Sequence, residues 1–237
     1  MAILAGAGPM GLAAINYIIK CKRKPKLLVV TDVDHARLKR AELVYSVEEA
    51  AKNNVTLEYI NINEMPEAEN YMMKLVDGKG YDDVMVFAPV KQVIEQADRL
   101  LGTDGCLNFF AGPSEANFKA ELNFYNVHYA STHIVGTSGG NIDDMVKALK
   151  MISEGLLNPA AMVTHVGGLN AAVEATLNLP NIPGGKKLIY THVEMPLIAI
   201  DEMEEIGKKD PKLAKLAEII KDNNGLWSVE AEKYLIN

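Results

Sequence analysis

The turn Gly6-Ala7-Gly8-Pro9-Met10-Gly11 limits the fold of this chain more than any other feature, because it separates two apolar segments of different period. Ala2 to Ala5 before it has the length and character of a buried strand. Pro9 to Cys21 after it has helical spacing of apolar residues, and a proline suits the first turn of a helix. A strand, a glycine-rich turn and a helix are therefore expected in direct succession.

The same succession of strand and helix continues through the first 158 residues. Strands are predicted near residues 27–31, 55–60, 83–87, 106–110 and 133–136, and helices near residues 33–44, 65–76, 91–101 and 143–153. Regular alternation of this kind is typical of a parallel sheet with helices on both faces. The predicted fold class is α/β, a Rossmann-type doubly wound parallel sheet over residues 1–158 with a C-terminal helical extension.

Residues 159–237 do not continue the alternation and are predicted to form a separate C-terminal segment. Val163 to Gly168 and the strand-like Lys187 to His192 flank a loop from Pro180 to Lys187. From Asp201 onward, charged residues surround apolar ones at helical spacing. Two exposed helices are expected in this tail, and we assign it no function.

Composition excludes several classes of protein. A net charge of −7, from 24 basic and 31 acidic residues, argues against a nucleic-acid partner. No apolar run approaches the roughly 18–20 residues that a membrane span needs, so no membrane partner is expected. The two cysteines, Cys21 and Cys106, are too few for a disulfide framework and are expected as small core residues. A cytoplasmic protein is the resulting expectation.

The glycine turn indicates a dinucleotide site. In G-x-G-x-x-G, the first glycine permits a tight turn, the second lets a pyrophosphate approach the backbone, and the third lets the helix pack on the strand. Asp32 ends the second predicted strand, where a carboxylate can accept hydrogen bonds from ribose hydroxyls and repel a 2′-phosphate. This favours NAD, although Arg37 could reach a 2′-phosphate and leaves NADP possible. The alternative is a purely structural turn with a helix-capping aspartate.

Catalytic and metal-binding motifs are absent from the sequence. The pairs Tyr17/Lys20 and Tyr71/Lys74 are one residue too close for the Tyr-x-x-x-Lys of short-chain dehydrogenases, and no serine stands in G-x-S-x-G. None of the five histidines has metal-ligand spacing. His165, expected in a glycine-flanked loop, is the best functional candidate among them, against the alternative of a hydrogen-bonded structural histidine. No catalytic or metal-ligating residue is predicted.

Further residues resemble the zinc-type medium-chain dehydrogenase/reductase family. They are the turn GAGPMG, Asp32, the segment GKGYD at residues 78–82 and Gly112. The run NPAAMVTHVGGLNAAVEATLNLPNIPGGKKLIYT at residues 158–191 resembles, more specifically, the sorbose-1-phosphate reductase branch of that family. The resemblance covers roughly residues 2 to 200.

The resemblance implies positions for each part of a dinucleotide. The pyrophosphate would lie on the glycine turn and the adenosine on the end of the second strand. The nicotinamide would be approached from the ends of the later strands. By position, the residues implied are Gly6, Gly8, Pro9, Met10 and Gly11 for the pyrophosphate, Asp32 and Val33 for the adenosine, Ala88, Pro89, Phe110, Ala111 and Gly112 along the adenine and nicotinamide, and Gly136, Thr137 and Ser138 at the nicotinamide.

The resemblance also implies chemistry that this chain would not supply alone. Family members hold a catalytic zinc through Cys, His and Glu ligands in an N-terminal domain that does not match any part of this sequence. Zinc would polarise the oxygen of a sugar alcohol or ketose phosphate while hydride passes to or from nicotinamide. The chain is therefore expected to bind NAD(H) without catalysing by itself. A homodimer is implied, with residues 126–136 as the paired sheet edge.

Two alternatives remain at this stage. A stand-alone nucleotide-sensing or regulatory domain would need no catalytic half, and a natural gene beginning at Met1 would favour it. A zinc-independent quinone-type reductase of the same superfamily is disfavoured by the run at residues 158–191.

Overall fold

The chain folds into two compact units, Met1–Leu157 and Asn158–Asn237. The structure is a computed structural model that describes residues 1–136 and 138–237. Within these residues, no helix is long and apolar enough to cross a membrane.

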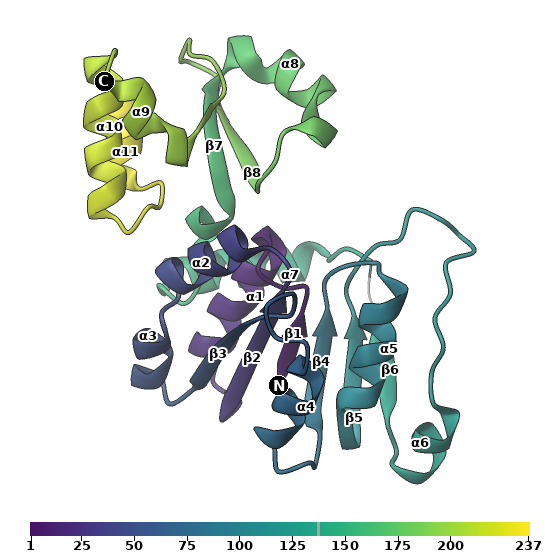
Figure 1. The fold of residues 1–237 in the computed structure, drawn as a ribbon. Coiled ribbons are helices and arrows are strands. Elements are labelled where there is room, and N and C mark those ends of the chain that lie inside the picture. The colour runs from purple at the N-terminus through teal and green to yellow at the C-terminus, as the bar shows by residue number, and fades with distance from the viewer. Residues whose placement is uncertain (137) are drawn as a thin grey trace. The chain divides into compact units, whose positions relative to one another are not determined.

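The first unit contains a six-stranded sheet, and every neighbouring pair of its strands is parallel. The strand order β3-β2-β1-β4-β5-β6 is that of a Rossmann fold, which confirms the predicted fold class. Figure 1 shows helices on both faces of this sheet. The elements are β1 (Ala2–Leu4), α1 (Pro9–Lys20), β2 (Leu27–Asp32), α2 (His35–Val44), α3 (Val47–Lys52), β3 (Thr56–Asn61), α4 (Ala68–Lys74), β4 (Tyr81–Val86), α5 (Lys91–Leu100), β5 (Leu101–Phe109), α6 (Phe124–Tyr129), β6 (His133–Gly136) and α7 (Ile142–Ser153).

The central strand β1 is buried on both sides. Ala2 and Leu4 pack in one core with residues of α4 and α5, among them Met72 and Ala97. Ile3 lies between them in the strand, so its fully buried side chain points to the opposite face of the sheet. Burial on both faces explains why β1 reads as a continuous apolar segment rather than an alternating one.

Two short helices of the first unit were not predicted. Helix α3 begins after Ser46, whose hydroxyl accepts a hydrogen bond from the Glu49 amide, a start signal that the sequence does contain. Helix α6 is six residues long and has no buried residue, so hydrophobic periodicity could not indicate it. In addition, β5 begins at Leu101 instead of near Cys106, because a register shift against β4 adds residues at its start.

The second unit combines a small sheet with a helical cluster. Its elements are β7 (Val163–Gly168), α8 (Ala172–Leu177), β8 (Lys186–Tyr190), β9 (Ile198–Ala199), α9 (Met203–Gly207), α10 (Pro211–Asp222) and α11 (Val229–Ile236), with short 3-10 turns at Pro159–Met162, Leu169–Ala171, Leu179–Asn181 and Ile200–Glu202. Strand β7 lies between β8, which is parallel to it, and β9, which is antiparallel.

The expectation of two exposed helices in the tail is wrong. Three helices, α9 to α11, follow residue 201, and their apolar faces are buried. Leu216 of α10 and Ala231 of α11 are fully buried in one core with Trp227 and with Val166 of β7. The helical spacing of apolar residues in the tail is therefore the pattern of a helix face that packs in a core. The many charged residues of the tail led to the prediction that its helices are exposed.

Candidate functional site

A cavity of about 390 Å³ opens at the carboxyl edge of the parallel sheet, above β1, β2 and β4. Ligands of open α/β folds bind at this edge, where the strand order reverses beside the first strand. The lining is mostly apolar and consists of Ala5, Gly8, Pro9, Met10, Gly11, Thr31, Asp32, Val33, Arg37, Ile62, Phe87, Ala88, Val90, Val93 and Gln96.

Two glycines of the turn are required by packing within the protein. A Cβ atom on Gly6 would lie 2.0 Å from Cγ2 of Ile3, and one on Gly11 would lie 1.7 Å from the carbonyl oxygen of Gly6. Both distances are far below contact, so α1 can approach β1 only because these side chains are absent. The roles given to the first and third glycines agree with this geometry.

Gly8 differs from the other two glycines, because no atom of the described residues lies within 4 Å of the position of a Cβ atom there. Its φ of −75° is one that any residue adopts, so backbone conformation does not require glycine either. Gly8 is the N-cap of α1 and forms no side-chain capping hydrogen bond, and no acidic residue stands in the first turn. The open space beside Gly8 and the amides at the start of α1 can therefore accept an anionic group.

Asp32 is buried, with 3% of its surface exposed, and its carboxylate organises the turn around it. Oδ2 accepts a hydrogen bond of 3.0 Å from the amide of Ala7. Oδ1 accepts hydrogen bonds from the amides of Val33 and Asp34, at 2.8 and 3.1 Å. Asp32 also lines the cavity, so one carboxylate connects the glycine turn to the end of β2.

The structure brings together about half of the residues predicted for the site. Gly6 does not line the cavity and packs closely on Ile3. Pro89, Phe110, Ala111, Gly112 and Ser138 follow strands at the same edge of the sheet, and Gly136 is the last residue of β6, but none of these six residues lines the cavity. Thr137 lies outside the described residues. The predicted residues that line the cavity are Gly8, Pro9, Met10, Gly11, Asp32, Val33 and Ala88.

Sequence reasoning missed several lining residues, of which Phe87 and Ala5 are the most informative. The ring of Phe87 lies 5.0 Å from that of Phe110, so the two aromatic residues connect the cavity with the end of β5. Ala5 has a φ of +52°, a left-handed conformation that is uncommon outside glycine, where the chain leaves β1. Position directly after a strand could have indicated Phe87, whereas nothing in the sequence marks Ala5.

Arg37 on α2 also lines the cavity and is engaged by a neighbouring acid. Its Nε lies 3.5 Å from Oδ2 of Asp34, and its backbone amide donates a hydrogen bond of 3.1 Å to Oδ1 of the same residue. Asp34 is thus both the N-cap of α2 and the ion-pair partner of Arg37.

His165 lies on strand β7 and not in a loop as expected. It is buried, and its Nδ1 lies 2.9 Å from the hydroxyl of Thr164, which also accepts the amide of Gly185. Burial, and then the ammonium group of Lys187 on β8, lower the pKa of His165. Its surroundings are those of a structural histidine, the alternative that the sequence left open.

No group of three or more His, Cys, Asp or Glu side chains is arranged to hold a metal ion within residues 1–136 and 138–237. The donor set that a zinc ion requires is therefore not formed by the described residues.

The sequence pattern of the zinc-binding dehydrogenase family matches residues 9–154 of this chain. Mannitol-1-phosphate 5-dehydrogenase of Aliivibrio fischeri is 53% identical over 236 residues, which are 100% of this chain and 56% of that protein. L-sorbose 1-phosphate reductase of Klebsiella pneumoniae is 45% identical over 234 residues, 99% of this chain and 54% of that protein. The chain thus spans little more than half the length of these relatives.

A solved structure supports the same fold. A short chain alcohol dehydrogenase from Escherichia coli CFT073, solved as a complex with NADH, superposes with a TM-score of 0.60 at 17% identity. The superposition covers 80% of this chain and 51% of that one.

Proposed function

This chain belongs to the zinc-binding dehydrogenase family, and on that premise we propose that its first unit binds NAD(H) for an oxidoreductase acting on a sugar alcohol or ketose phosphate. The observation that carries the proposal is the open space beside Gly8. Neither backbone conformation nor packing within the protein requires a glycine there, while the space beside it opens into the cavity. A ligand that approaches the backbone closely would explain why glycine, and no larger residue, occupies this position.

The pyrophosphate is proposed to lie on the turn from Gly6 to Gly11. Gly6 and Gly11 shape the turn, Gly8 leaves room for the phosphate oxygens, and the uncapped start of α1 offers backbone amides. Pro9 and Met10 complete the cradle, since both line the cavity. Helix N-termini favour anions through their free N–H groups and their dipole.

The adenosine is proposed to lie between the ends of β1, β2 and β4. Asp32 would accept hydrogen bonds from the ribose hydroxyls while it keeps its bonds to the turn, since a carboxylate has about four acceptor sites and three are used here. Val33 and Ala88 also line the cavity. Because a 2′-phosphate would meet the Asp32 carboxylate, NAD is proposed over NADP.

The nicotinamide half is proposed to extend toward the ends of β5 and β6. Gly136 pairs with Phe109 in register, so Phe110, Ala111 and Gly112 leave the sheet at the edge where β6 ends, and Thr137 and Ser138 are the next two residues in the sequence. Pro89 follows the same edge. When bound, the nicotinamide donates or accepts a hydride, and the main chain of these residues would orient its ring.

The substrate class rests on the relatives, both of which are named for phosphorylated sugars or polyols. The described residues form no ligand set for zinc, so no role of theirs in the proposed function involves a metal ion. Among the described residues that line the cavity, only Asp32 and Arg37 have ionisable side chains, and both already have partners. The chain alone is therefore expected to bind the dinucleotide without turning over a substrate.

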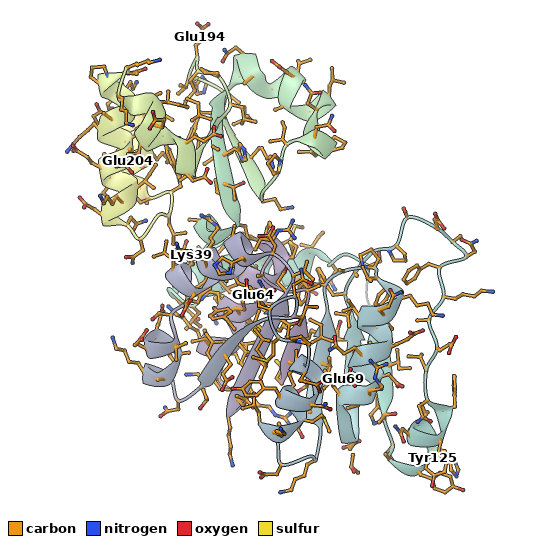
Figure 2. All side chains as sticks on the ribbon, in the orientation of Figure 1. Lys39, Glu64, Glu69, Tyr125, Glu194 and Glu204 are labelled. Atoms are coloured by element: carbon orange, nitrogen blue, oxygen red, sulfur yellow. The ribbon has the colours of Figure 1, made fainter. Side chains whose placement is uncertain are left out.

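A homodimer is proposed through the edge of the sheet at β6. This strand is last in the sheet order, and its Ile134 and Val135 are 44% and 45% exposed. Helix α6 adds the exposed rings of Tyr125 and Tyr129, the first of which is labelled at the outer end of the unit in Figure 2. Light scattering at micromolar concentration should give twice the mass of 25.9 kDa, and a monomeric mass would contradict the dimer.

The two free cysteines, Cys21 and Cys106, fit a reducing compartment, and the cytoplasm is the proposed location.

Thermal unfolding of the purified chain, titrated with NADH and NADPH in parallel, tests the proposed function. A ligand that binds only the native state stabilises it by about 2.7 kcal/mol at 100 times Kd. A rise in the melting temperature with NADH that exceeds the rise with NADPH is expected. Absence of any rise with either dinucleotide would contradict the proposal, and turnover of mannitol 1-phosphate by the chain alone would contradict the absence of catalysis.

A further inference from the structure

We propose that the side-chain amide of Gln96 on α5 recognises the edge of the dinucleotide's base and makes this site selective for adenine. This inference rests on the proposed binding of NAD(H) and assigns a group to the base, which the contacts proposed for the pyrophosphate and the ribose leave without one. Four lining residues carry it, and we call them the base wall: Ile62, Val90, Val93 and Gln96.

The base wall lies on one face of the parallel sheet. Ile62 follows β3 and Val93 belongs to α5, and both pack against the core that contains Leu4 of β1. The glycine turn packs instead on Ile3, whose side chain points to the opposite face. If the pyrophosphate lies on the glycine turn and the ribose meets Asp32 at the edge of the sheet, the base wall is the part of the cavity left for the base.

Three members of the base wall form one row along α5. Val90, Val93 and Gln96 stand three residues apart, so they follow one another on the same side of the helix. Val90 is the N-cap residue and is exposed, whereas Val93 and Gln96 are partly buried. The neighbouring Ile94 and Ala97 are buried in the core. Gln96 is therefore the member of the row farthest from the carboxyl edge of the sheet.

The amide of Gln96 is a polar group in an otherwise apolar wall. It offers a donor and an acceptor, and it forms no side-chain hydrogen bond with any residue that the structure describes. The charged lining residues Asp32 and Arg37, by contrast, already have partners. A partly buried amide without a partner costs free energy in the unliganded protein, and a ligand that supplies the partner recovers this cost.

Adenine matches the base wall in shape and in polarity. Its two ring faces are apolar and can pack against the side chains of Ile62 and Val93. Its edge presents the N6 amino donor between the ring acceptors N1 and N7. A glutamine amide has an acceptor and a donor in one plane, so two hydrogen bonds, to N6 and to a neighbouring ring nitrogen, satisfy both. Gln96 would thereby distinguish adenine from a base without this pair of groups.

Calorimetric titration of the purified chain with NAD⁺ and with 1,N6-etheno-NAD⁺ tests the inference. The etheno bridge joins N1 to N6 and removes the amino donor from the base edge. The unaltered chain should bind NAD⁺ about ten-fold more tightly than the etheno derivative, the scale of two neutral hydrogen bonds.

The substitution Gln96→Met keeps the length and the helix propensity of the side chain but removes its hydrogen-bonding amide. The affinity of this variant for NAD⁺ should fall about ten-fold, and its preference for NAD⁺ over the etheno derivative should shrink to less than about two-fold.

Gln92→Met is the matched control, because Gln92 stands one turn earlier on α5, is exposed and does not line the cavity. It should keep both affinities within about two-fold of the original. Without ligand, Gln96→Met should melt at least as high as the original chain, since the amide has no described partner to lose. A clear fall in melting temperature would assign the amide a structural role and contradict the inference.

The binding data can overturn the inference while the proposed function stands. Equal affinity of the unaltered chain for the two dinucleotides would show that the base edge is not recognised. Undiminished NAD⁺ affinity in Gln96→Met would remove the amide from the site. A preference for NAD⁺ that persists in Gln96→Met would make the discrimination steric and independent of this residue. If the unaltered chain bound neither dinucleotide, the proposed function would fail and this inference with it.

Discussion

The backbone amide of Ala7 donates a hydrogen bond of 3.0 Å to Oδ2 of Asp32, so the glycine turn after β1 is attached to the end of β2. The carbonyl oxygen of Thr31 reinforces the connection by accepting the amide of Gly6 at 2.9 Å. A residue proposed to bind ribose is therefore also a structural part of the turn proposed to bind phosphate. Stability and dinucleotide affinity are expected to change together when Asp32 is altered.

Asp32→Asn is expected to lower the free energy of unfolding by about 1–3 kcal/mol, because an amide group has one acceptor oxygen where the carboxylate has two. At least one of the amides of Ala7, Val33 and Asp34 then loses its buried partner. NADH affinity should fall in the same variant. Urea unfolding and calorimetric titration measure the two effects, with Asp82→Asn at an exposed position of β4 as the control. A variant as stable as the original would contradict the structural role of Asp32.

Alanine at Gly8 and at Gly11 should have opposite consequences. Gly11→Ala places a Cβ atom 1.7 Å from a backbone oxygen. It should lower the free energy of unfolding by more than about 3 kcal/mol, and the melting temperature should fall with it. The methyl group of Gly8→Ala would contact none of the residues that the structure describes, so this substitution should cost less than about 1 kcal/mol in the free energy of unfolding. It should nevertheless weaken NADH binding at least ten-fold, because its methyl group would enter the space proposed for the pyrophosphate.

Thermal unfolding and NADH titration of both variants separate the two effects. Undiminished NADH affinity in a stable Gly8→Ala variant would contradict the proposed placement of the pyrophosphate. A stable Gly11→Ala variant would contradict the close packing of α1 on β1.

Acidification should destabilise the protein through His165. Burial and the Lys187 ammonium lower the pKa of this imidazole in the folded state, so the unfolded chain binds its proton more readily. The stability that His165 contributes is complete above its ordinary pKa of 6.5 and is lost as pH falls through the lower folded value. Urea unfolding from pH 7.5 to 4.5 should show a steeper loss of stability in the original protein than in His165→Gln, and equal slopes would refute this account.

The side chain of Trp227 gives a direct report on the second unit. Its Nε1 donates to the hydroxyl of Tyr190 at 2.8 Å, and this hydroxyl donates to Glu232 at 2.6 Å. Tyr190→Phe removes both bonds and should lower the free energy of unfolding by about 1–2 kcal/mol. As Trp227 is the single tryptophan of the chain, its emission during urea unfolding follows this unit selectively. An unchanged urea midpoint in Tyr190→Phe, followed by Trp227 emission, would show that these two hydrogen bonds contribute nothing to the stability of the unit.

Local sequence patterns predicted much of the fold and part of the site. The strand-turn-helix at Gly6 to Gly11 and the acid at Asp32 lie where the motif spacing places them, because glycine contacts and strand ends are set by residues close in the chain. The tail was predicted wrongly, since burial of Leu216 depends on Trp227 and Val166, which periodicity within one helix does not reveal.

By itself, the sequence determined the alternation of strands and helices, the glycine turn and the residue types at the ends of the strands, since each depends on interactions within about ten residues. Tertiary structure alone decided that Asp32 accepts the amide of Ala7, that Ala5 lines the cavity, and that Arg37 lines the cavity while it stays paired to Asp34. A cavity shared by three neighbouring strands depends on the order in which the strands pair, and no local pattern encodes that order.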